Sequence, residues 1–321
     1  MQIKRLVIEN FKSIERIELV EPNPFTVFVG PNGSGKSNIF EALEFLILSN
    51  RFTVEATNSL FGGQQAYVRR QASGSQPKIH VELTSSYSLR FEFGSLSSGR
   101  DYRSSQPEKD DPSAAQLNNF TRLFINDKRE QKLNYTDDKR LAVKATNMET
   151  VLKRLLADEI LNDEIHEWLS LFIPGFRTIE VASGTFSGKD ELLVYEKDTE
   201  RPFTKDLISD GTFNIIALMT AIYQSNEPQF LCIEEPENGL HPEVLESLIP
   251  FFRKQCQERG NHIWLNTHSE TVVRLLTTDE IIVVNKRDSA TRTKQVKGMN
   301  IYSLTTDEAW LSGALGGGLV W

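Results

Sequence analysis

The chain has 321 residues, of which 39% are hydrophobic and 25% are charged. This composition is typical of a globular protein with a substantial core, and it excludes a mostly disordered chain, a collagen and a bundle of membrane spans. Lysine and arginine number 36 against 44 aspartate and glutamate residues, so the formal net charge is −8. A generally basic nucleic-acid coat protein is therefore excluded, and any contact with nucleic acid must be local.

The first part of the chain is predicted to form short strands around one helix. Strands are expected at residues 3–9, 16–20, 25–29, 80–83 and 88–93. The opening MQIKRLVIENF has no apolar segment before a small-residue cleavage site, and the longest nearly uncharged apolar stretch, 215–223, is far shorter than a bilayer span of roughly 20 residues. We therefore expect no secretory signal, no membrane contact and a cytoplasmic location.

Residues 95–148 are polar and follow neither the helical nor the strand period, which predicts a surface insertion. Residues 121–154 carry nine lysine or arginine residues against five acidic residues, with aromatic residues between them. This basic stretch is either a solvated face with ordinary salt pairs or a local site for nucleic acid or a partner protein. A helical pattern begins at Glu149 and ends near Pro174.

The last part of the chain alternates strands and helices. Strands are expected at 178–181, 192–195, 230–233, 262–266 and 281–284, and helices at 212–224, 242–257 and 269–276. Such alternation predicts an α/β sheet with ligand sites at the carboxyl ends of its strands. We therefore divide the chain into residues 1–94, 95–176 and 177–321. The two cysteines make no disulfide framework, and Cys232 is expected to be a buried, inert thiol.

A complete phosphate-binding pattern, G-x-x-x-x-G-K-[ST], follows the strand at 25–29 and precedes an apolar-faced helix. Glycines let successive backbone N–H groups face a phosphate, and the helix N-terminus adds its positive dipole. Lys36 is predicted to reach the β- and γ-phosphates of ATP, and the Ser37 hydroxyl to ligate Mg²⁺. The predicted nucleotide-binding residues here are Gly30, Pro31, Asn32, Gly33, Ser34, Gly35, Lys36, Ser37 and Asn38.

Two carboxylates, Glu234 and Glu235, end the apolar strand at 230–233. At the carboxyl edge of the sheet one of them can hold the Mg²⁺ shell while the other orients and deprotonates a water. Acidic pairs at strand ends are also common on surfaces, so this pair alone does not decide the chemistry.

Four segments follow one another in an order that resembles the motif order of ABC-type ATPase heads. Among these heads, the resemblance is to the SMC, RecF and OLD-like group. The segments are 30–37, LISDGT at 207–212, EEPENGLHP at 234–242 and NTHS at 266–269, and IENFKSI at 8–14 also resembles that group. The resemblance covers both lobes but not residues 95–148. It implies an α/β ABC-ATPase head, in which a P-loop sheet with flanking helices is joined by an N-terminal antiparallel β part and a helical and polar insertion.

The resemblance also implies roles for particular residues. Glu235 matches the catalytic glutamate, His268 matches the switch histidine, and Glu234 stands at the Mg²⁺ position where most relatives have aspartate. Ser209 and Gly211 match the signature residues that bind the γ-phosphate held by the opposite subunit. The chain is therefore expected to form a head-to-head homodimer through ATP. As alternatives from the residues themselves, Ser209 is a helix cap and His268 a satisfied histidine at the edge of the core.

Three further positions are assigned less fully by the resemblance. His241 replaces the interface aspartate of transporter ATPases, which favours the OLD-like branch, and residues 237–241 match the loop that crosses the dimer interface. Gln64 and Gln65 are candidates for the Q-loop glutamine. Lys12 is either a contact to the base or ribose or an exposed turn lysine.

The chain shows no sustained heptads, no Asp-x-Asp, no His-Glu-x-x-His and no Cys/His cluster of metal-binding spacing. We therefore do not expect it to cut nucleic acid alone. We therefore expect an ATP-driven switch for a separately encoded effector, plausibly a nuclease in bacterial antiviral defence, with DNA or RNA as a further candidate partner. The alternatives are a RecF-type DNA repair ATPase and a scaffold that binds ATP with little turnover. The glycine-rich tail WLSGALGGGLVW at 310–321 is expected to be a flexible or partner-seeking terminus.

Overall fold

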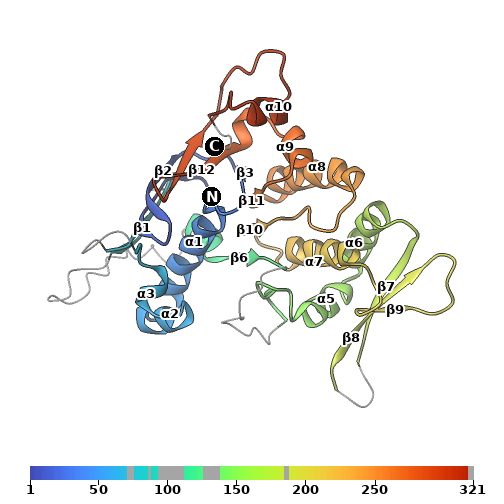
Figure 1. Ribbon diagram of the computed structural model, residues 1–321. Coiled ribbons are helices and arrows are strands. Elements are labelled where there is room, and N and C mark those ends of the chain that lie inside the picture. Colours follow the sequence, from blue (N-terminus) through green and yellow to red (C-terminus); the bar gives the residue numbers. More distant parts are fainter. Residues whose placement is uncertain (71–75, 86–87, 93–111, 126–137, 184–187, 317–321) are drawn as a thin grey trace.

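The computed structural model describes residues 1–70, 76–85, 88–92, 112–125, 138–183 and 188–316. These residues build a ten-stranded mixed sheet and a separate three-stranded sheet, with helices packed against them (Figure 1). The α/β class expected for an ATPase head is confirmed. Within the described ranges, no helix is both long and apolar enough to cross a membrane.

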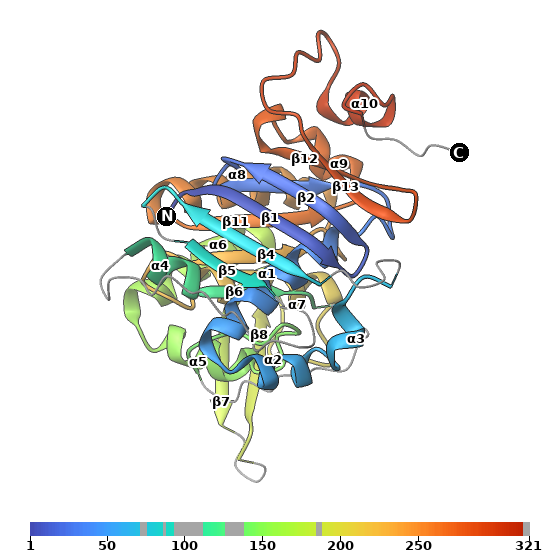
Figure 2. The same cartoon turned by 90° about the vertical axis from the view of Figure 1, so that its left-hand side faces the viewer.

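One half of the large sheet is mostly antiparallel, with strand order β5-β4-β1-β2-β13-β12. Figure 2 shows β1, β2 and β4 side by side on the face turned toward the viewer. The expected N-terminal antiparallel part is therefore present, and it is completed by a hairpin from the far end of the chain. The strands are β1 (Ile3–Phe11), β2 (Ile14–Val20), β4 (Lys78–Leu83), β5 (Ser88–Glu92), β12 (Ile281–Arg287) and β13 (Ala290–Gln295).

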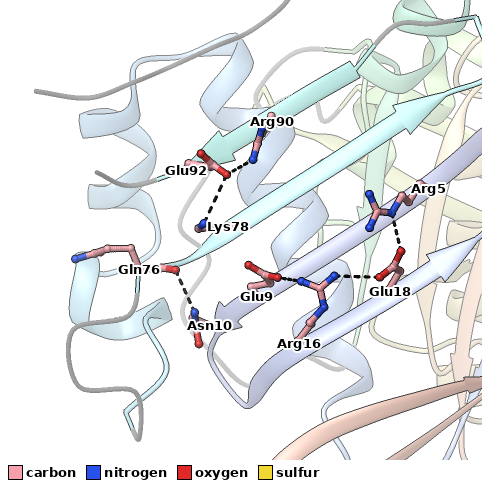
Figure 3. A network of polar contacts seen from close by, with 9 residues as sticks. All are labelled: Arg5, Glu9, Asn10, Arg16, Glu18, Gln76, Lys78, Arg90 and Glu92. Carbon is pink, nitrogen blue, oxygen red and sulfur yellow. Dashed lines mark hydrogen bonds and ion pairs between the residues drawn. The ribbon is translucent and has the colours of Figure 1, made fainter. Parts of the chain in front are cut away.

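The outer face of this half carries charged side chains that pair with one another (Figure 3). Arg5 donates to Glu18 over 2.6 Å, and Arg16 contacts both Glu9 and Glu18. The hydrogen bond from Arg5 lowers the pKa of Glu18. Solvent-exposed pairs of this kind contribute little stability, so they mark this face as the solvated side of the sheet.

The other half of the sheet is parallel, with strand order β12-β3-β11-β10-β6. Almost every residue of its strands is buried because helices cover both faces. The carboxyl ends of the parallel strands therefore meet along one edge. The additional strands are β3 (Phe25–Val29), β6 (Phe120–Leu123), β10 (Phe230–Glu234) and β11 (His262–Thr267).

Alternate residues of the parallel strands point into two different cores. Phe28, Cys232 and Trp264 pack toward α1 (Lys36–Arg51), whereas Val27 and Leu265 pack toward the helices on the opposite face. Burial raises the pKa of the Cys232 thiol, and the expected buried cysteine is confirmed. The opposite face is covered by α5 (Met148–Leu156), α6 (Glu159–Phe172), α7 (Asp210–Tyr223), α8 (Pro242–Arg259) and α9 (Glu270–Arg274).

The remaining elements are short and lie around these layers. In Figure 1, the small sheet extends away from the main one beyond α6. These elements are α2 (Val54–Leu60), α3 (Gln64–Tyr67), α4 (Pro112–Asn118), β7 (Phe176–Ser183), β8 (Asp190–Glu196), β9 (Phe203–Thr204), a 3₁₀ turn (Thr278–Glu280) and α10 (Thr306–Leu311).

Three expectations from the sequence require correction. The helical pattern from Glu149 forms two helices, because Asp158 caps a new helix by accepting from the backbone N–H groups of Ile160 and Leu161. The strands expected at 178–181 and 192–195 belong to the small sheet and not to the α/β sheet. Residues 112–125, expected within a surface insertion, instead contain α4 and the sheet strand β6. Residues 93–111, 126–137 and 317–321 lie outside the described residues.

Candidate active site

The phosphate loop connects β3 to α1. It requires glycine at two positions because neighbouring atoms lie too close for a Cβ. A Cβ at Gly30 would lie 2.1 Å from the carbonyl oxygen of Val284, and one at Gly35 would lie 2.0 Å from Thr291 Oγ1. Gly35 also has φ = 100°, which favours glycine. No side chain caps the first turn of α1, so its backbone N–H groups face the loop.

Two residues that the sequence analysis did not identify support the loop from behind. Thr291 Oγ1 donates to the carbonyl oxygen of Ser34 over 2.8 Å and lies 2.6 Å from Ser13 Oγ. The side-chain amide of Asn38 donates to Ser13 Oγ over 2.6 Å. Asn38, predicted to bind nucleotide, therefore uses its side chain to tie α1 to the β1–β2 turn. Ser13 falls within the IENFKSI segment, and only this resemblance could have indicated it.

Lys36 and Ser37 lie at the mouth of the loop, as the pattern predicts. The Lys36 ammonium donates to the carbonyl oxygens of Gly30 and Pro31 over 2.6 and 3.1 Å. Burial lowers the pKa of Lys36, and the nearby carboxylates of β10 and the following loop oppose this shift. The Ser37 hydroxyl donates to Glu234 Oε2. The two residues predicted to hold Mg²⁺ are thus in direct contact across 197 positions of sequence.

Glu234 is 4% exposed, and both of its carboxylate oxygens have partners. Oε2 also accepts from the Asn266 side chain over 3.0 Å, and Oε1 accepts from Arg122 Nε over 2.6 Å. A hydroxyl and a carboxylate in contact are a donor set that Mg²⁺ accepts when phosphate oxygens complete its shell. Across the described ranges, no cluster of three or more His, Cys, Asp or Glu residues could hold a metal without such added ligands.

Glu235 and His268 lie side by side at the ends of β10 and β11. Glu235 Oε1 is 3.6 Å from His268 Nδ1, and Glu235 Oε2 accepts from the Asn238 amide over 2.9 Å. The Glu235 backbone has φ = 48° and its N–H donates to the Asn266 carbonyl over 3.0 Å. The side chains of Glu235 and His268 are 26% and 40% exposed, so this carboxylate can reach a water molecule whereas Glu234 cannot.

A third carboxylate, Glu237, stands close by and had been assigned only to the predicted interface loop. Thr267 Oγ1 donates to Glu237 Oε1 over 2.5 Å, and burial raises the pKa of Glu237. Its position two residues after Glu235 gives no sequence pattern of its own. Glu237 adds to the negative potential that favours the charged form of Lys36.

The predicted signature residues begin α7. The Ser209 hydroxyl accepts from the Thr212 N–H over 3.0 Å and so caps α7, and γ-phosphate binding by Ser209 stays a prediction. The Asn214 amide donates to the carbonyl oxygens of Pro236 and Asn238 over 3.0 and 2.9 Å. The start of α7 is thereby fastened to the loop that follows Glu235 within the same chain.

The remaining candidates lie outside this cluster. Gln64 donates to the side chain of Gln76, and no described hydrogen bond joins Gln64 or Gln65 to the phosphate loop. Lys12 forms an ion pair with Glu41, and His241 caps α8. The Q-loop assignment and a contact between Lys12 and nucleotide stay predictions.

The basic stretch 121–154 is only partly available to a partner. Arg122 is buried among carboxylates, and Arg154 donates to the carbonyl oxygens of Asp138 and Gln224. Lys153 pairs with Asp190 over 2.6 Å. Three further cations of the stretch, Lys128, Arg129 and Lys132, lie outside the described residues. Arg122 must therefore be removed from the predicted binding surface.

Comparisons with known proteins agree with this arrangement. A family model described as "AAA domain, putative AbiEii toxin, Type IV TA system" matches residues 25–274. The DNA replication and repair protein RecF of Streptomyces avermitilis is 34% identical over 85 residues, which are 26% of this chain and 23% of that protein. The chain thus matches less than a quarter of the length of this curated relative.

Solved structures show the same fold. The SMC head domain from Thermotoga maritima superimposes with a TM-score of 0.53 and 16% identity, covering 92% of this chain and all of that domain. An SMC head bound to the C-terminal winged-helix domain of ScpA gives a TM-score of 0.52 and 15% identity, covering 92% and 97% of the two chains. The family match over residues 25–274, together with this fold, shows that the chain belongs to that AAA-domain family as an SMC/RecF-like ABC-type P-loop ATPase.

Proposed function

We propose that the chain hydrolyses the β–γ phosphoanhydride bond of ATP with Mg²⁺, as a head-to-head dimer that switches a separate effector. The observation that carries this proposal is the contact between Ser37 and Glu234 beside a partly exposed Glu235. Phosphoryl transfer to water needs two such groups: a buried carboxylate beside the serine hydroxyl that would ligate Mg²⁺, and an accessible carboxylate that can take a proton from water.

Each residue at the sheet edge has a chemical role in this proposal. Ser37 and Glu234 would hold Mg²⁺, which neutralises charge on the phosphates when it is bound. Lys36 compensates negative charge on the β- and γ-phosphates. Glu235 orients the attacking water and takes its proton on Oε1, while Asn238 fixes Oε2. His268 lies 3.6 Å from Oε1, where it can steady the γ-phosphate as the bond to the β-phosphate oxygen breaks.

The dimer part of the proposal rests on the exposed start of α7. Ser209 is exposed while its hydroxyl caps the helix, so the N-terminus of α7 can face a γ-phosphate held by a second subunit. Residues 237–241 would then lie at the interface, because the Gly211 backbone touches that of Gly239.

The effector part is supported by the partner complex of a structural neighbour. The SMC head solved with a domain of ScpA is bound to a separate protein. We propose a comparable, separately encoded partner for this chain, a nuclease acting in bacterial defence. The description of the matching family includes a toxin–antitoxin system, which agrees with such a pairing.

A RecF-type role in DNA repair is the second candidate, because the RecF relative shares 34% identity over 85 residues. This role predicts turnover that DNA stimulates and a DNA affinity that falls as salt rises. If DNA does not change the rate of ATP hydrolysis, the effector switch is the better proposal.

The central test is Lys36→Ala. Loss of the ammonium should weaken ATP binding or turnover at least about tenfold, roughly 1.4 kcal/mol. Lys4→Ala is the matched control, because Lys4 pairs with Glu82 on the solvated face of the sheet. Full ATP hydrolysis by the Lys36 variant would refute the proposed site.

A further inference from the structure

Arg122 is a buried cation placed directly on the predicted metal carboxylate. In the register of β6 and β10 it pairs with Cys232, whose side chain points toward α1, as does that of Glu234 two residues later. Arg122 Nη2 lies 2.5 Å from Glu234 Oε1, and Nη1 donates to Glu44 Oε2 over 2.9 Å. Arg122 thus links the edge strand to α1 and to the end of β10.

The Arg122 guanidinium carries its positive charge among several carboxylates. Burial lowers the pKa of Arg122, but Glu234 and Glu44 raise it more, so the guanidinium stays charged. Arg122 Nη2 also lies 3.6 Å from Glu41, which pairs with Lys12. Arg122 thus shares its positive charge among three carboxylates, and Glu234 is the one that contacts the Ser37 hydroxyl.

The two oxygens of Glu234 are held by different partners. Oε2 is fixed by the hydroxyl of Ser37 and the amide of Asn266, independently of Arg122. Oε1 faces the guanidinium alone among the described hydrogen bonds. The orientation of Glu234 toward Ser37 is thus secured without Arg122, and what Arg122 adds is positive charge.

We infer that Arg122 acts through the charge of Glu234 and sets the Mg²⁺ concentration at which the site binds ATP. This inference rests on the proposed function. The guanidinium and a bound Mg²⁺ would both be attracted to the Glu234 carboxylate and would repel each other. The guanidinium therefore weakens Mg²⁺ binding to this carboxylate. Removing the guanidinium charge should therefore lower the Mg²⁺ concentration that nucleotide binding requires.

The test measures binding of a fluorescent, non-hydrolysable ATP analogue during a Mg²⁺ titration. Arg122→Gln keeps a hydrogen-bond donor but no charge, and it should lower the half-saturating Mg²⁺ concentration at least about tenfold. Arg122→Lys keeps the charge and should stay near the wild-type value. Arg90→Gln, on the solvated face, is a control for loss of an arginine.

A second variant protects the test against misfolding. Loss of Arg122 leaves Glu44 without this partner, and its side chain is only 15% exposed. A carboxylate that is largely withdrawn from water and loses its cation destabilises the fold. The double variant Arg122→Gln/Glu44→Gln removes that charge. It should need at least about tenfold less Mg²⁺ than Glu44→Gln alone, because these two proteins differ only at Arg122, and it should have a higher melting temperature than the single Arg122 variant. All variants are checked by thermal unfolding before the titration.

The outcomes separate this inference from the function on which it rests. If the wild-type chain shows no Mg²⁺-dependent nucleotide binding, the proposed function is overturned and the inference with it. If the wild-type chain depends on Mg²⁺ and each folded Arg122→Gln protein needs as much Mg²⁺ as its parent with Arg122, or more, the role of Arg122 alone is overturned.

Discussion

Gly211 at the start of α7 lies directly against Gly239 in the loop that follows Glu235. A Cβ at Gly211 would come within 2.2 Å of the Gly239 carbonyl oxygen, so only glycine fits. The Asn214 amide reinforces the same contact through two carbonyl oxygens of that loop. A movement of α7 must therefore shift the loop that holds Asn238, and Asn238 positions the Glu235 carboxylate.

Gly211→Ala should accordingly slow ATP hydrolysis at least about tenfold, roughly 1.4 kcal/mol of activation free energy, because the added methyl displaces this loop. ATP binding to the phosphate loop should change much less, since Lys36 and Ser37 are not touched. Asn214→Ala, which removes the two donors without adding bulk, should lower turnover in the same direction. Equal turnover in wild type and Gly211→Ala would contradict this coupling.

Glu235→Gln should separate binding from chemistry. The amide can still accept from Asn238 but cannot take a proton, so hydrolysis should fall by roughly 10²–10⁴ while ATP stays bound. A dimer should then appear in size-exclusion chromatography only when ATP is present. If Glu234→Gln, and not Glu235→Gln, gives this trapped dimer, the roles of the two carboxylates are reversed.

Mixing two inactive proteins tests whether the signature acts across the dimer. Ser209→Arg blocks the start of α7, and Lys36→Ala disables the phosphate loop, so each heterodimer should contain one intact composite site. The ATPase rate of the mixture should exceed that of either variant alone. With heterodimers shown by two affinity tags, a rate no higher than the parents' would mean that Ser209 serves only as the cap of its own helix.

His262 should make stability depend on pH. Burial lowers the pKa of His262 to about 4, below the usual value near 6.5. Between these values the unfolded chain binds a proton that the folded chain does not, so the free energy of unfolding should fall as pH drops from 6.5 to 4. Relative to His262→Gln, the wild type should lose up to about 3 kcal/mol over this window, measured by urea unfolding. If the free energy of unfolding changes equally with pH in the wild type and in His262→Gln, His262 does not titrate in this way.

The phosphate loop could be predicted because the residues that would bind phosphate are consecutive in the sequence. Its glycines also indicate a tight turn of the backbone. Glu234 and Glu235 could be placed because an apolar run predicts a buried strand whose carboxyl end is fixed. Strand β6 could not be predicted. Its four residues stand in a polar stretch, and the charge of Arg122 contradicts a buried position until its partners are known.

The supports of the loop were missed for a related reason. Ser13 and Thr291 meet only because β13 pairs with β2, and a single residue pair joins these strands. No local pattern in either segment predicts a hydrogen bond across 278 positions. Such contacts follow from the topology of the sheet, which the order of predicted strands leaves open.

The support that Thr291 gives to Ser34 also sets an order of events during synthesis. A ribosome adding roughly 5–20 residues per second needs some tens of seconds to travel from the phosphate loop to β13. Until then the carbonyl of Ser34 lacks the donor that braces it. The emerging chain thus carries the complete phosphate-binding motif long before β13 is made, and ATP can meet the braced form of the loop only after that strand has been synthesised.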